Sequence, residues 1–153
     1  MAIENGFDVD HLDEFTLKLL KLAKKTMPKE CNKFMKVEAS KLNSKTKKKA
    51  KKEVKKNTGN YLKGFKRGKK VYDYEDVKYN IRVYNSSPHA HLIEYGHEVV
   101  KGGKHSNKGN KGGKKVGFVK GKYILDKSSR EFENEFGKDT LEFVDNLLDK
   151  GLS

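Results

Sequence analysis

The chain has 153 residues, of which 34% are hydrophobic and 37% are charged, so it is long enough for one domain but not for a large core. No apolar stretch approaches the roughly 20 residues that a membrane-spanning helix needs, and we expect no membrane partner. Acidic residues follow Met1 where a signal peptide would be basic and then apolar, so none is expected. The single cysteine, Cys31, cannot form an intramolecular disulfide or a cysteine zinc site. We expect it to be a small core residue of a protein made in a reducing cytoplasm.

The formal net charge is +14, and lysine carries nearly all of the positive charge. Lysine is a flexible point charge, so the composition favours nonspecific attraction to polyanions over the forked recognition of bases by arginine. A lysine-rich chain can equally reflect an AT-rich genome. The charge is segregated, with acidic residues in 4–14 and 131–149 and basic residues in 45–56 and 101–115. Such segregation suits self-assembly, although solvated charge runs are the alternative for each segment.

Two helices are predicted before residue 57. Asp8 or Asp10 is placed to cap the first, in which Leu and Phe recur at helical spacing. Pro28 interrupts the pattern and is expected to open the second helix as its first residue, over about 29–56. The sequence Asn57-Thr58-Gly59 should end it.

Alternation of apolar and polar residues predicts strands at about 62–74 and 77–84, joined by a turn. Pro88 should begin a short helix capped by Ser86 or Ser87, with Leu92, Ile93 and Tyr95 facing inward and Gly96 ending it. A further strand is expected at 97–100.

Residues 101–116 are rich in Gly and Lys and are predicted to form a flexible loop, with structure resuming at Val116. A long final helix should start near Lys122 or Tyr123 and close at Gly151. We therefore predict a single domain over residues 1–153, of the α+β class, with a small antiparallel sheet and long N-terminal and C-terminal helices packed against it.

The segment 86–97 gathers histidines, a carboxylate and a tyrosine, and it invites an interpretation as a metal or catalytic site. Residues two apart on a helix point about 200° away from each other, so His89 and His91 cannot share an ion there. Gly96 should break the helix between Glu94 and His97, and no zinc-binding, nucleophile-elbow or phosphate-loop pattern is present. We predict no metal, no cofactor and no enzyme activity. A small hydrolase that uses His89, His91 and Glu94 is kept as a third alternative.

The basic segments supply the candidate contacts to a polyanion or to an acidic partner. Backbone phosphate contact or docking on an acidic protein ring would use lysines of this kind. The candidates are Lys47, Lys48, Lys49, Lys51, Lys52, Lys104, Lys108, Lys111, Lys114 and Lys115.

Four motifs follow one another along nearly the whole chain. They are a turn after a lysine-rich helix (Thr58-Gly59-Asn60-Tyr61-Leu62), a strand (79–84), the segment Ser87-Pro88-His89-Ala90-His91-Leu92-Ile93-Glu94-Tyr95-Gly96-His97, and a glycine-led start of the last helix (117–125). In this order they resemble the minor tail-component family of long-tailed double-stranded DNA phages, also called tail-completion, neck or head–tail joining proteins, and distantly minor tail protein Z of phage lambda. The chain departs from the pattern at Asn60-Tyr61 and in its longer Gly/Lys loop.

The resemblance implies a non-enzymatic virion protein that is made in the host bacterial cytoplasm and assembles as a ring, expected to be hexameric, at the head–tail junction. Its partners would be further copies of itself, head-closure or connector proteins, and tail-terminator or tail-tube proteins, with nonspecific contact to the phage DNA. The residues that match the structural motifs are Thr58, Gly59, Leu62, Pro88, His89, Ala90, Glu94, Tyr95 and Gly96. Pro88 would start a helix, Glu94 would cap or pair with a nearby lysine, and the histidines would pack or cap. The alternative function is a basic nucleic-acid-binding accessory module.

Overall fold

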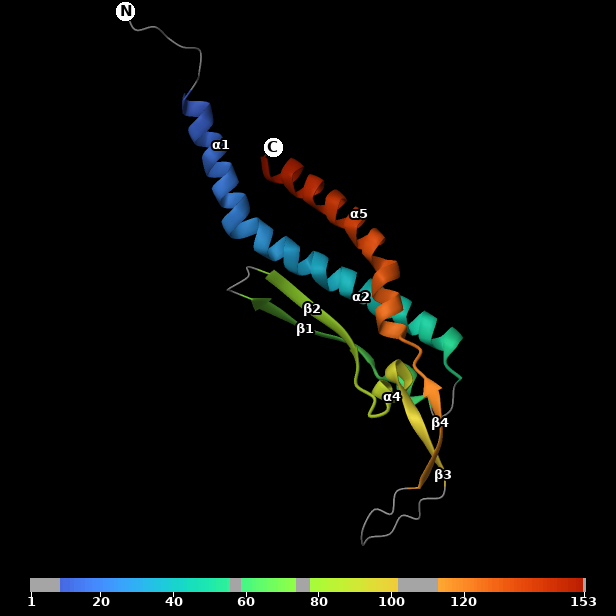
Figure 1. Ribbon diagram of the computed structural model, residues 1–153. Helices are drawn as coiled ribbons and strands as arrows, with labels where there is room; N and C mark the ends of the chain where they lie inside the picture. Colours follow the sequence, from blue (N-terminus) through green and yellow to red (C-terminus); the bar gives the residue numbers. More distant parts are fainter. Residues whose placement is uncertain (1–8, 56–58, 74–77, 102–112, 153) are drawn as a thin grey trace, which may run out of the picture. The chain divides into compact units, whose positions relative to one another are not determined.

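A computed structural model describes residues 9–55, 59–73, 78–101 and 113–152 (Figure 1). Along the sequence, one long helical region precedes the strands and another follows them. The elements are α1 (Val9–Lys21), the π-helical segment η1 (Leu22–Thr26), α2 (Met27–Glu53), α3 (Asn60–Lys63), β1 (Phe65–Asp73), β2 (Lys78–Asn85), α4 (Ala90–Tyr95), β3 (Gly96–Lys101), β4 (Lys114–Lys120) and α5 (Ile124–Leu152). The predicted α+β class is confirmed.

The chain contains two compact units, and its organisation as a single domain stays a prediction. The first comprises Met1–Glu38, Lys69–Ile81 and Glu133–Ser153, and the second comprises Ala39–Gly68 and Arg82–Phe132. Both long helices and both strands of the first hairpin contribute to each unit. Each unit is therefore described by itself.

Pro28 lies one residue inside α2, and the helix before it does not stop as we predicted. The backbone N–H of Met27 bonds to the carbonyl of Leu22, which is a π-helical bond. Proline has no N–H to donate and its ring collides with the carbonyl four residues earlier. A wider π turn absorbs this defect while the chain stays helical.

In the first unit, the start of α2 packs against the C-terminal half of α5 through aromatic rings. Phe34 stacks on Phe143 with ring centroids 4.4 Å apart. The centroid of the Phe136 ring lies 6.0 Å from that of Phe34. Leu22 of η1 and Leu147 of α5 are also buried. Phe136, Phe143 and Leu147 recur at helical spacing on α5, as the residues of one apolar stripe do, whereas Phe34 was not among the residues predicted for the stripe of the second helix.

The core of the second unit joins five elements. Ala50 of α2, Tyr61 of α3, Phe65 of β1, Ala90 of α4 and Ile124 of α5 form one buried cluster. Tyr61 and Phe65 meet edge to face, with ring centroids 5.0 Å apart. Large aromatic rings thus supply much of the buried area in a chain that contains no tryptophan.

The strands form two separate two-stranded sheets, β1–β2 and β3–β4, instead of one. Leu62 lies in α3 and not in a strand, and β1 begins at Phe65. The second hairpin also reaches further into the predicted loop than expected, since β3 includes Lys101 and β4 starts at Lys114. Its antiparallel register pairs Gly96 with Lys120 and Lys101 with Lys114, with a bulge beside Val99 and Val100.

Candidate functional site

The segment 86–97 folds as a turn, a short helix and the start of a strand. The N–H of Ala90 bonds to the carbonyl of Ser87 at 3.0 Å, so Pro88 lies in a turn just before α4 instead of beginning the helix. His89 occupies the N-cap position, and no side chain caps the helix as Ser86 or Ser87 was expected to do. Gly96 ends α4, as predicted.

Glu94 is the centre of this segment. Its side chain is 5% exposed, and its carboxylate accepts hydrogen bonds from the Tyr61 hydroxyl at 2.7 Å and from the Leu125 backbone N–H at 3.2 Å. The second bond caps the first turn of α5, where a negative charge also complements the helix dipole. Of the two roles expected for Glu94, capping is therefore the one observed.

Tyr61 responds to this environment. Burial in the core raises the pKa of the Tyr61 hydroxyl well above its usual range, and the hydrogen bond to Glu94 raises it further. Tyr61 therefore stays a neutral donor that ties α3 to α4.

Backbone contacts reinforce the same junction. The N–H groups of Lys122 and Tyr123 bond to the carbonyls of Ile93 and Glu94 at 2.8 and 3.1 Å. A Cβ atom on Gly121 would lie 2.3 Å from the carbonyl oxygen of Glu94, so only glycine permits this approach. Together with Glu94 and Tyr61, these residues form what we call the Glu94 junction, which joins α3, α4 and α5.

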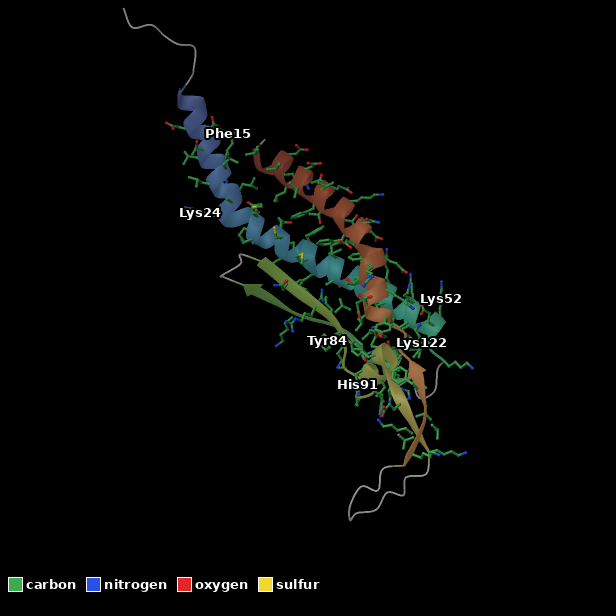
Figure 2. The ribbon with its side chains drawn as sticks, viewed as in Figure 1. Phe15, Lys24, Lys52, Tyr84, His91 and Lys122 are labelled. Atoms are coloured by element: carbon green, nitrogen blue, oxygen red, sulfur yellow. The ribbon has the colours of Figure 1, made fainter. Side chains whose placement is uncertain are left out.

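Of the three histidines of the segment, His89 and His91 take no part in the junction. His89 and His91 are exposed, and Figure 2 labels His91. Tyr95 is 68% exposed, so the expectations that these two histidines pack and that Tyr95 faces inward are wrong. His97 is partly buried. Because the Glu94 carboxylate is occupied by Tyr61 and Leu125, the arrangement does not support the hydrolase alternative.

A notch lined with lysines lies in the second unit, between α2 and the beginning of α5. It has a volume of about 340 Å³ and is lined by Lys45, Lys48, Lys49, Lys52, Glu53, Ser128 and Glu131. Lys49 pairs with Glu131 and, at 3.8 Å, with Glu53, whereas Lys48 and Lys52 are exposed. Of the predicted lysines of α2, Lys47 and Lys51 are exposed but do not line the notch. The Ser128 hydroxyl is buried and has no hydrogen-bond partner among the described residues.

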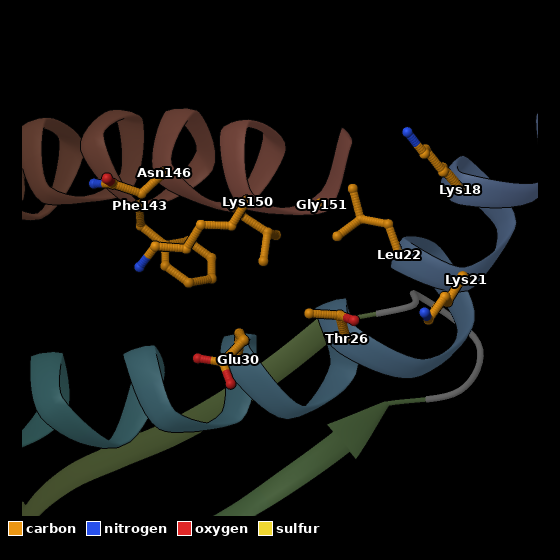
Figure 3. A pocket seen from close by; sticks show the side chains of 10 residues that line it. Lys18, Lys21, Leu22, Thr26, Glu30, Phe143, Asn146, Lys150 and Gly151 are labelled. Atoms are coloured by element: carbon orange, nitrogen blue, oxygen red, sulfur yellow. The ribbon is translucent and has the colours of Figure 1, made fainter. Parts of the chain in front are cut away.

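An open groove of about 650 Å³ runs between the first helices and the end of α5 in the first unit (Figure 3). Its lining includes the apolar side chains of Leu22, Phe143 and Leu147 and the basic side chains of Lys18, Lys21 and Lys150. A Cβ atom on Gly151 would lie 2.5 Å from the Leu22 side chain, which shows how closely the two helices approach.

Residues 13–96, more than half of the chain, match the family described as "Bacteriophage HK97-gp10, putative tail-component". The chain belongs to this family of phage tail components. No curated protein and no solved structure matches it. The resemblance seen in the sequence is thus confirmed at the level of a phage tail component, and a family of structural tail components implies a non-enzymatic role.

The matched region of this tail component ends at Gly96, so it contains Tyr61 and Glu94 but neither β4 nor α5. Sequence reasoning missed Tyr61 as the partner of Glu94, although Tyr61 is where the chain departs from the family pattern. Leu62 packs against the core beside it, and Gly59, with φ of 79°, starts α3. Thr58, Lys104, Lys108 and Lys111 lie outside the described residues.

Three further features of the tail component can be stated for the described ranges. No group of three or more His, Cys, Asp or Glu side chains there is placed to hold a metal ion. None of its described helices is both long and apolar enough to cross a membrane. Cys31 is half-buried rather than fully in the core, and burial raises the pKa of its thiol.

Proposed function

We propose that this tail component is a tail-completion or neck subunit, distantly related to minor tail protein Z of phage lambda. Copies of it form a ring, expected to be hexameric, at the head–tail junction and join the tail to the DNA-filled head. Its neighbours there are head-closure or connector proteins on one side and tail-terminator or tail-tube proteins on the other. Like other virion proteins it is made in the host bacterial cytoplasm.

Ring assembly is supported above all by the apolar surface that the chain leaves uncovered. Among the described residues, seventeen large hydrophobic side chains are exposed, whereas nine hydrophobic residues are buried. A soluble monomer rarely exposes extended apolar patches, and such surfaces mark sites of protein association. In a family of tail components, further subunits are the natural cover for them.

Deleting the coding sequence from its phage tests this function. We expect filled heads and separate tails in the lysate, which join when the purified protein is added. Complete virions in the absence of the protein would contradict the proposal. Light scattering and negative-stain microscopy of the purified protein test the ring directly, and a particle of several subunits is the expected result.

A second candidate function, nonspecific contact with DNA, is favoured by the lysine notch. Three exposed lysines, Lys45, Lys48 and Lys52, line one concave site, and lysine side chains commonly contact phosphate oxygens. Here the lysine pairs of α2 offer a matched comparison. Lys48→Glu with Lys52→Glu changes the notch, while Lys47→Glu with Lys51→Glu makes the same charge change outside it.

DNA binding by the free protein, measured over a range of salt concentrations, decides between the two surfaces. If the notch holds phosphate, the Lys48/Lys52 double variant loses more affinity and shows the smaller salt slope. Equal losses in both double variants would mean diffuse attraction by the lysines of α2. No retention of the unmodified protein at low salt would eliminate DNA contact.

A further inference from the structure

The hairpin β3–β4 cannot be stable through its own contacts. Eleven of its residues are exposed and the other two, Gly96 and His97, are partly exposed, with β4 exposed along its whole length. Val100, Val116 and Phe118 are 51%, 52% and 64% exposed. Isolated two-stranded hairpins are marginal in water and need a third strand or a packed helix for stability. The hairpin extends away from α4 and from the first turns of α5 without meeting either again (Figure 1).

The charges of the hairpin indicate what should cover it. Its strands carry Lys101, Lys114, Lys115 and Lys120 against one carboxylate, Glu98, which pairs with Lys115 at 2.7 Å. At the far end Lys101 lies directly opposite Lys114. Like charges facing each other across a hairpin are destabilising, and a nearby acidic surface would relieve them. Pairing of two hairpins edge to edge would instead bring lysines together, which disfavours that mode.

An acidic and apolar surface of matching character lies on α5. Leu141, Val144 and Leu148 are 70%, 38% and 41% exposed and recur at helical spacing, so they form one stripe. Glu142 and Asp145 are exposed and follow the same stripe. We call this set the α5 stripe. It presents carboxylates beside aliphatic side chains, which is the complement of lysines beside valines and phenylalanine.

We propose that the β3–β4 hairpin of one copy docks on the α5 stripe of a second copy of the same chain. Val116 and Phe118 cover the aliphatic residues of the stripe, and Lys101 and Lys114 face Glu142 and Asp145. The contact is head-to-tail, because two different surfaces of the chain meet, and repeated contacts of this kind close into rings when the rotation permits. This inference rests on the proposed ring function and names the interface within it.

Disulfide trapping between differently tagged copies tests the docking. Both copies carry Cys31→Ser, so that the introduced cysteines are the only thiols. One copy carries Val116→Cys on the hairpin and the other carries Leu148→Cys on the α5 stripe. In the matched control, the second copy carries Val37→Cys on α2, which is 53% exposed and lies outside the stripe.

Docking predicts that the hairpin–stripe pair forms the mixed disulfide at least about tenfold faster than the control pair, because the thiols are held together. Adding Glu142→Lys and Asp145→Lys to the stripe should remove this advantage, since like charges would then meet. Lys101→Glu and Lys114→Glu on the hairpin should restore it. Equal rates for the hairpin–stripe and control pairs, or no recovery on charge exchange, would overturn the docking.

Light scattering on the Cys31→Ser protein separates this inference from the function it rests on. A ring without preferential trapping leaves the proposed function intact and overturns the hairpin interface. Preferential trapping without any closed particle supports the interface and contradicts the ring. If the protein forms no ring and the hairpin–stripe pair shows no preferential trapping, both the proposed function and the hairpin interface are contradicted.

Discussion

Gly96 adopts a backbone conformation that side chains rarely tolerate, with φ of 88° and ψ of 175°. A Cβ atom there would also lie 2.3 Å from the carbonyl oxygen of Val119, and this backbone atom can move only if β4 moves with it. We expect Gly96→Ala to reduce the free energy of unfolding by about 3 kcal/mol, from backbone strain and displacement of β4. Urea denaturation followed by circular dichroism measures it.

Gly137→Ala is the matched control for this substitution. Gly137 is exposed inside α5, and a Cβ atom added there meets nothing within 4 Å. Alanine should therefore stabilise the helix by about 0.5–1 kcal/mol. Similar effects of the two substitutions would show that the junction does not depend on the conformation of Gly96.

The hydroxyl of Tyr61 should support the fold in a pH-dependent way. Tyr61→Phe leaves the buried Glu94 carboxylate without one donor, and we expect a loss of about 1–3 kcal/mol in unfolding free energy at neutral pH. Burial and the Glu94 bond raise the pKa of Tyr61 in the folded chain, whereas the unfolded chain titrates near the ordinary value of about 10. The contribution of the hydroxyl is thus complete below about pH 10 and is lost as the pH rises above it.

Denaturation midpoints of the unmodified chain and of Tyr61→Phe between pH 8 and 11 check this sign. The gap between them should be constant up to about pH 10 and then narrow. Tyr84→Phe, which removes an exposed hydroxyl from β2, should leave the midpoint unchanged at neutral pH. A gap that widens with pH would contradict the assignment of Tyr61 as a neutral donor.

At the level of elements, the aromatic stack between α2 and α5 holds the first unit together. Phe34 contacts the rings of both Phe136 and Phe143. Because Phe34 is half-buried, Phe34→Ala should cost about 2–3 kcal/mol of unfolding free energy, less than for a fully buried ring. Phe15→Ala on α1 removes a ring that is 46% exposed and should change stability by less than about 0.5 kcal/mol. Thermal unfolding of both variants compares them, and equal losses would argue against the stack.

The long helices could be predicted from the sequence because their apolar residues recur over many turns, as around Met35 and Phe136. The π-helical segment before Pro28 could not be predicted, because a single π turn has no sequence pattern of its own. The hydrogen-bond partners of Glu94 could not be predicted from the sequence either. Its bonds reach residues 33 and 31 positions away, and periodicity reports only local structure. The composition of the lysine-rich ends of β3 and β4 predicts a loop, but strand pairing depends on the partner strand more than on composition.

For the whole molecule, the net charge of +14 and the proposed contact between hairpin and stripe act in opposite directions on assembly. Copies of a strongly basic chain repel each other at long range, whereas Lys101 and Lys114 attract Glu142 and Asp145 at short range. The screening length decides whether added salt weakens the long-range repulsion or the short-range attraction. At about 0.1 M ionic strength it is already about 10 Å, so the long-range repulsion is mostly screened and further salt acts mainly on close pairs.

We therefore expect the average mass of the protein at fixed concentration, measured by light scattering, to fall as sodium chloride rises from about 0.15 to about 0.5 M, because charge pairs at the contact are screened. Sodium sulfate of equal ionic strength should lower the mass less, since sulfate strengthens the burial of Val116, Phe118 and the aliphatic stripe. The variant with Glu142→Lys and Asp145→Lys is the control, and its mass should be smaller at the start and change little with either salt. A mass that rises with sodium chloride would mean that repulsion between basic copies still dominates, and that the acidic stripe does not supply the contact.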